Sequence, residues 1–87
     1  MKLNEKLAAI LAIAEDDRRQ ESIARAEKQK PKLIEKLVSQ AQRGNADGIL
    51  IDDGDRTYID HLSSYFSTEG FEVKEPEKNR ILITVSR

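Results

Sequence analysis

The residues that could do chemistry in this sequence gather in one short acidic stretch. Asp52, Asp53 and Asp55 follow the apolar run of residues 49–51. Three carboxylates this close together could hold a hard cation such as Mg²⁺ or Ca²⁺. The same side chains are also common turn formers and helix caps. Because a helix is expected directly after them, these local roles already account for each acid, and the sequence favours them over a metal site.

Residues 48–73 resemble the opening of a response-regulator receiver domain. Both have an apolar strand, paired acids (here Asp52 and Asp53), a helix ending in Gly and a second short strand. A receiver carries its phosphate on another Asp, at the end of a later parallel strand that follows a helical crossover. Here only the turn of residues 76–79 separates the last two apolar segments, so these must form an antiparallel hairpin. The final segment contains no Asp, and we therefore predict no phosphorylation switch.

Other catalytic patterns are incomplete. Asp53 and Asp55 resemble the Asp-x-Asp loop of haloacid-dehalogenase-type phosphatases, but Arg56 stands where that loop has Gly. An EF-hand calcium loop does not align with these acids. His61 is the only His, and neither a nucleophile nor a second ligand accompanies it. With no Cys and no phosphate-binding glycine motif, the sequence predicts a protein that is not an enzyme and holds no cofactor or metal.

Length and composition indicate one small, helix-rich domain. The chain has 87 residues, of which 36% are charged and 38% are hydrophobic. No apolar run approaches the roughly 20 residues of a spanning helix, so we expect no membrane partner and a cytoplasmic location, or a virion. The net charge of −1 argues against a general nucleic-acid binder, although a local basic face could still exist.

The segment of residues 1–30 is expected to form an extended helix that lies mostly in water. Asn4 is its expected N-cap. The 4-3-4 spacing of a coiled-coil seam is kept by Leu3, Leu7, Ile10 and Ala14. The seam then stops, because its next two positions are Asp17 and Glu21. Since a lone helix of this kind is marginal without packing, the pattern predicts an interaction or oligomerisation arm.

A second amphipathic helix is expected after Pro31, which either kinks the first helix or begins a new one. The sequence leaves this choice open. Gly44 is expected to end the second helix. The apolar stripe that should pack on the core consists of Leu33, Ile34, Leu37, Val38 and Ala41.

From residue 49 onward the pattern becomes β-α-β-β. Apolar or alternating segments at residues 49–52, 71–74 and 81–85 predict strands, and an amphipathic helix capped by Asp55 or Thr57 lies between the first two. The expected fold class is α+β, with a three-stranded sheet covered by helices on one face. Residues 31–87 would form this small domain, and residues 1–30 the arm.

Two apolar side chains are expected on the opposite face of that sheet. Leu50 and Leu82 alternate with the residues that should enter the core. They would form a small exposed patch unless a partner covers them.

From residue 32 onward the chain resembles small, uncharacterised proteins of tailed bacteriophages. The similarity lies in the segments "LIEKLVSQAQRG", "GILID", "YIDHLSSYFSTEGF" and "ILITVS". Those proteins often finish with Ile-Ser-Trp, whereas this chain finishes with Val85-Ser86-Arg87. The resemblance implies a phage origin and the helix-plus-β-α-β-β fold. It assigns no chemistry, so it transfers no site residue.

The sequence therefore predicts a non-enzymatic protein–protein interaction module, docking on a protein partner or on its own copy. Helix-in-groove or coiled-coil association would supply the affinity. The predicted interaction residues are Leu3, Leu7, Ile10, Leu11, Ala14, Leu50 and Leu82. The alternative is a small nucleic-acid-binding accessory protein, which would use the basic cluster of residues 28–32 with Arg18, Arg19 and Arg25.

Overall fold

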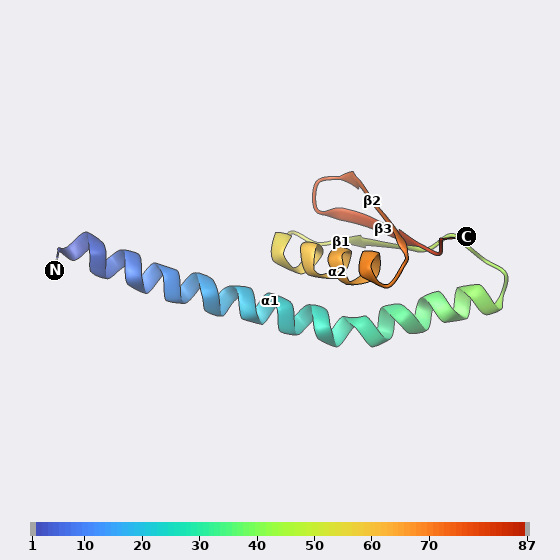
Figure 1. Cartoon of the computed structure of the whole chain (residues 1–87), viewed down its shortest axis with the longest axis horizontal. Coiled ribbons are helices and arrows are strands. Elements are labelled where there is room, and N and C mark those ends of the chain that lie inside the picture. The colour runs from blue at the N-terminus through green and yellow to red at the C-terminus, as the bar shows by residue number, and fades with distance from the viewer. Residues whose placement is uncertain (1, 87) are drawn as a thin grey trace.

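The computed structural model describes residues 2–86 and has the α+β architecture that the sequence predicts (Figure 1). A long helix comes first, followed by a strand, a second helix and a two-stranded hairpin. The elements are α1 (Leu3–Gln42), β1 (Ile49–Asp52), α2 (Arg56–Thr68), β2 (Glu72–Glu77) and β3 (Arg80–Thr84).

The helices expected on either side of Pro31 are one continuous helix. Proline removes one helical hydrogen bond, but strong helix formers flank it on both sides, and α1 bends only gently (Figure 1). With 40 residues the helix is about 60 Å long, which nearly equals the 62 Å length of the molecule. It begins at Leu3, after Lys2 as N-cap, so the predicted Asn4 cap is wrong.

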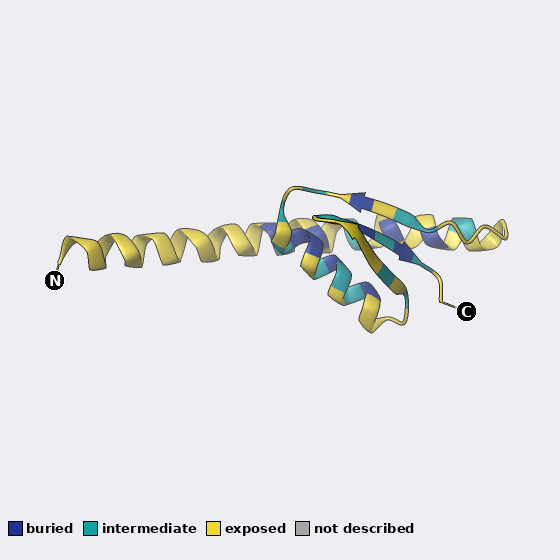
Figure 2. Cartoon of the chain, turned by 90° about the horizontal axis from the view of Figure 1, so that it is seen from above, coloured by how far each residue is buried: buried dark blue, intermediate teal, exposed yellow. Residues whose placement is uncertain are grey.

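The fully exposed part of α1 ends at Glu21 (Figure 2). Ser22 is only 6% exposed and Ala26 is completely buried, so α1 meets the rest of the chain from residue 22 onward. The division predicted after residue 30 therefore falls inside the packed part of the helix. Small side chains make the first contacts, and they give little hydrophobic signal in the sequence. We call residues 3–21 the projecting segment.

The sheet has the strand order β1-β3-β2, and both strand pairs are antiparallel. β2 and β3 form the predicted hairpin, which turns at Lys78 and Asn79, the latter with a φ of 61°. β3 is the central strand, and both of its inward side chains, Ile81 and Ile83, are large, aliphatic and buried. Pro76 lies in the edge strand β2, where a missing backbone N–H is tolerated.

Both helices lie on one face of the sheet, as predicted, and the core forms there (Figure 1). The edge-on ring pair Phe66 and Phe71, with centroids 5.4 Å apart, closes one end of it. The core residues are Ala26, Leu33, Leu37, Ile51, Tyr58, Ile59, Leu62, Phe66, Ile81 and Ile83.

The apolar stripe expected after Pro31 is only half buried. Leu33 and Leu37 enter the core, but Ile34 and Val38 are 36% and 49% exposed. The prediction that these two pack inward is therefore wrong. One continuous helix touches the domain along a narrow line, whereas a separately docked helix could have turned a wider face inward.

Candidate functional site

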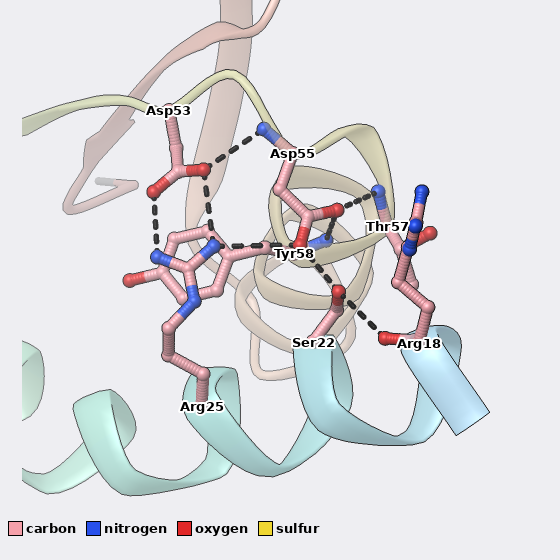
Figure 3. A network of polar contacts seen from close by, with 7 residues as sticks. All are labelled: Arg18, Ser22, Arg25, Asp53, Asp55, Thr57 and Tyr58. Carbon is pink, nitrogen blue, oxygen red and sulfur yellow. Dashed lines mark hydrogen bonds and ion pairs between the residues drawn. The ribbon is translucent and has the colours of Figure 1, made fainter.

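The acidic turn between β1 and α2 lies against α1 (Figure 3). Asp55 is the N-cap of α2, since its Oδ1 accepts the backbone N–H of Thr57 at 3.0 Å and of Tyr58 at 3.4 Å. Of the two caps that the sequence allowed, the structure uses Asp55. The other oxygen of this carboxylate accepts a hydrogen bond from the Ser22 hydroxyl of α1. The turn thus caps one helix and holds another.

Arg25 makes a second connection between α1 and the turn. Its Nη1 donates to Oδ2 of Asp53 at 2.8 Å and its Nη2 donates to Oδ1 at 3.1 Å, which is a two-point ion pair. Nη2 also lies 3.4 Å from Oδ2 of Asp55. The guanidinium carbon stacks 4.0 Å from the centre of the Tyr58 ring (Figure 3). We call Ser22, Arg25, Asp53 and Asp55 the polar cluster.

The hydrogen bonds of the polar cluster lower the pKa of both carboxyl groups. The guanidinium of Arg25 is the main cause for Asp53. For Asp55 the main cause is the Ser22 hydroxyl, and the backbone N–H groups that it caps add to the effect. The pKa of Arg25 is raised, chiefly by its bond to Asp53. At neutral pH the cluster therefore holds two carboxylates and a guanidinium, all charged.

The acids of the turn are engaged with donors of their own chain. Asp52 is the most exposed of the three, and its Oδ2 pairs with Arg80 of β3 at 2.9 Å. Among residues 2–86, no three His, Cys, Asp or Glu side chains are grouped so that they could hold a metal ion. The role that the geometry gives to Asp53 and Asp55 is to fasten α1 to the start of α2.

His61 forms another connection between the two helices. Its Nε2 lies 2.7 Å from Oε1 of Glu27 in α1. The same carboxylate accepts a bond from Lys30 at 2.6 Å, and this bond is the main cause of the lowered pKa of Glu27. The Lys30 ammonium in turn lies 4.0 Å from the centre of the Tyr65 ring. His61 is thus part of a packing contact between helices.

The basic residues considered for nucleic-acid binding are partly engaged within the chain. Arg25 belongs to the polar cluster, and Lys30 is held by Glu27. Arg18 and Arg19 line a shallow hollow of about 420 Å³ whose walls also carry carboxylates.

The projecting segment is exposed along its whole length (Figure 2), and it carries a row of large apolar side chains. Four of these side chains and the exposed Ala14 were among the predicted interaction residues, and together they form the apolar stripe of the projecting segment. Ile13, which the 4-3-4 pattern passed over, is 64% exposed and widens the stripe. The exposed fractions are 70% for Leu3, 55% for Leu7, 62% for Ile10 and 59% for Leu11.

The two remaining predicted interaction residues lie together on the far face of the sheet. Leu50 of β1 is opposite Leu82 of β3 in the strand register, with Lys74 of β2 beyond it. Leu50 is 55% exposed, and Leu82 is half-buried. This pair is distant in the fold from the stripe, because the helices occupy the other face.

Sequence reasoning missed one apolar groove. Its volume is about 190 Å³, and almost all of its lining is carbon. Helical periodicity had assigned the α1 part of this lining to the core. It is formed by Ile34, Leu37, Val38, Ala41, Phe71 and Val85.

Comparison of the chain with protein-family models, with curated proteins and with solved structures found no match. The fold and the side-chain geometry are therefore the basis for inferring a function. Among the described residues, no helix is long and apolar enough to cross a membrane.

Proposed function

We propose that this protein is a non-enzymatic protein–protein interaction module that binds its partner through the projecting segment of α1. One observation carries the proposal. Five large aliphatic side chains of one helix, Leu3, Leu7, Ile10, Leu11 and Ile13, are each at least 55% exposed. Single exposed aliphatic residues are ordinary on protein surfaces. Five of them on three successive turns form a continuous apolar surface of the kind that marks a binding site.

The energetics of the segment point the same way. Fully burying a Leu or Ile side chain contributes about 1.5–3 kcal/mol, and the stripe leaves most of that contribution unused. A helix without tertiary packing is also marginal in water. A partner that covered the stripe would gain apolar contacts and would stabilise the helix at the same time. Docking of a helix face into a complementary apolar surface is the binding mode that fits.

The test compares two substitutions in the full chain. Ile10→Glu places a charge in the stripe, and Ala12→Glu places the same charge roughly 160° away around the helix, where no apolar surface would be lost. Each immobilised variant is offered a host lysate and, separately, the purified protein itself at millimolar concentration, so that weak self-association is also detected. Equal urea midpoints would show that both variants keep the fold.

The proposal expects a bound protein, either foreign or a copy of the chain, that the wild type and Ala12→Glu retain and Ile10→Glu loses. Binding that is insensitive to Ile10→Glu, or no binding in either experiment, contradicts it. The phage resemblance is part of the same proposal and would place the protein in a virion or in the host cytoplasm. A nucleic-acid role would instead show an affinity that falls steeply with salt, and the pairing of Arg25 and Lys30 does not favour it.

A further inference from the structure

We infer that the partner of the projecting segment is a second copy of the same segment, packed antiparallel to the first. The inference rests on the proposed function, because it names the partner of that binding surface. It follows from the spacing of the stripe, from the order of charges along it and from the side of α1 that the domain occupies.

The spacing of the stripe is self-complementary when one copy is reversed. Leu3, Leu7, Ile10 and Ala14 occupy alternating positions of a coiled-coil seam. In the reversed copy Leu3 lies opposite Ala14, and Leu7 lies opposite Ile10. All four layers of the seam are then apolar. The two outer layers pair Leu3 with the small Ala14, and the two inner layers pair Leu7 with Ile10, which is of equal size.

The order of charges selects the antiparallel arrangement over the parallel one. The next seam position after Ala14 is Asp17, and Glu15 and Asp16 precede it, whereas Lys2 and Lys6 lie at the other end of the segment. A parallel pair would place Asp17 against Asp17. The antiparallel pair places it beside the first turn of the other helix, near Lys2. That helix end also attracts an anion through its dipole, and Lys2, its N-cap, makes no side-chain capping bond.

The domain leaves room for this partner. Ser22 and Ala26 mark the side of α1 that packs on the domain. At about 100° per residue, the centre of the stripe lies roughly 110° away from that side around the helix axis. In the antiparallel pair the second domain lies beyond the N-terminus of the first helix, so the two domains are at opposite ends and do not collide.

The seam is short, so the dimer should be weak. Its few layers bury much less than the roughly 800 Å² per partner of a standard stable interface. We expect a Kd of roughly 0.1–1 mM, which a covalent trap can detect.

The chain contains no Cys, so introduced thiols report on pairing without background. Leu3→Cys and Ala14→Cys are made separately in the full chain, mixed in equal amounts and oxidised. Mass spectrometry then distinguishes the mixed disulfide from the two symmetric ones. Ala12→Cys, on the far side of the helix, measures random collision.

The antiparallel pair predicts that the mixed disulfide predominates well beyond the half expected for random pairing. Adding Ile10→Glu to both chains should lower the yield of the mixed disulfide at least tenfold, which corresponds to a loss of about 1.4 kcal/mol or more in the free energy of pairing. Asp17→Lys should lower the yield several-fold and Glu15→Lys, outside the seam, much less. Symmetric disulfides in excess would indicate a parallel pair and overturn the inference. Yields no higher than those of Ala12→Cys would overturn self-pairing altogether.

These failures are separable from failure of the proposed function. If the disulfides do not form but a lysate protein is still lost with Ile10→Glu, the stripe binds a foreign protein and only the second-copy inference is wrong. If neither experiment responds to Ile10→Glu, both proposals are wrong.

Discussion

Replacing Asp55 by Ala is the sharpest test of the polar cluster, because this one carboxylate serves two elements. It caps α2 through the N–H groups of Thr57 and Tyr58, and it accepts the hydroxyl of Ser22 from α1. Loss of an Asp N-cap costs about 1 kcal/mol, with a range of about 0.5–2. Loss of a hydrogen bond to a charged acceptor costs about 1.5–3 kcal/mol in general.

The second cost should be at or below the lower end here, because the Ser22 hydroxyl can still donate to the backbone oxygen of Arg18 at 3.1 Å. Asp55→Ala is therefore expected to lower the free energy of unfolding by about 2–2.5 kcal/mol. In a domain of this size that lowers Tm by about 10–20 °C. Urea denaturation followed by circular dichroism measures it directly.

Two controls make the result interpretable. Asp52→Ala removes the same charge from the same turn, but Asp52 is exposed and pairs only at the surface with Arg80. Its cost should stay below about 1 kcal/mol. Asp55→Asn keeps a good capping group and should cost less than Asp55→Ala. If Asp55→Ala and Asp52→Ala were equally mild, the polar cluster would not fasten α1, and the reasoning would be refuted.

Acid should reveal the same cluster. The pKa values of Asp53 and Asp55 are lower in the folded chain than the usual value near 3.8. Their contribution to stability is therefore complete above that ordinary pKa and is lost as the pH falls through the lowered folded values. The stability advantage of the wild type over Asp55→Asn should narrow between neutral pH and about pH 3. An advantage that stayed constant or grew on acidification would contradict this.

Five further substitutions test the packing by urea denaturation. Gly48→Ala should cost more than about 2 kcal/mol, because φ is +81° and the new Cβ would lie against a backbone oxygen of β3. Gly44→Ala should cost only about 1 kcal/mol, because φ is similar at +73° but nothing lies within 4 Å of the new Cβ. Equal costs would contradict the close approach at Gly48. Pro31→Ala should stabilise the chain by about 1 kcal/mol or more, since it restores a donor in a continuous helix, and a loss of stability would show that the bend is needed. Ile51→Ala should cost about 2–5 kcal/mol because Ile51 is buried, and Leu50→Ala should cost less than about 1 kcal/mol because Leu50 is exposed. The reverse order of costs would mean that the two faces of the sheet are assigned wrongly.

The sequence was sufficient to predict the parts of the fold that follow from periodicity. The alternation in residues 81–85 and the short turn before it require a hairpin, and the apolar face of α2 requires a sheet to pack on. These signals are local, because the spacing of the apolar side chains within each segment is enough to identify it as a strand or as an amphipathic helix. The position of β3 in the centre of the sheet is not a local property, and it emerges only when both edges are paired with it.

The polar cluster was not predictable in the same way. Ser22 and Asp55 are 33 positions apart, and Arg25 and Asp53 are 28 apart, so no short pattern joins them. In the sequence Ser22 looks like any polar residue on a water-exposed helix. The continuity of α1 through Pro31 could likewise not be read from the proline alone, because strong helix formers on both sides outweigh its local preference to stop.

The polar cluster also fixes how α1 is rotated about its axis relative to the domain. Apolar contacts have no preferred direction, so rolling α1 about its axis could turn Ile10 and Leu7 toward the side of the helix that the domain occupies. A two-point Arg–carboxylate pair has a fixed geometry, and Arg25 with Ser22, three positions before it, holds one face of the helix against the turn. The rotation of the helix is thereby fixed where the projecting segment begins. The acidic turn that resembles a phosphorylation site instead sets which side of α1 packs on the domain, and the centre of the apolar stripe lies roughly 110° from that side.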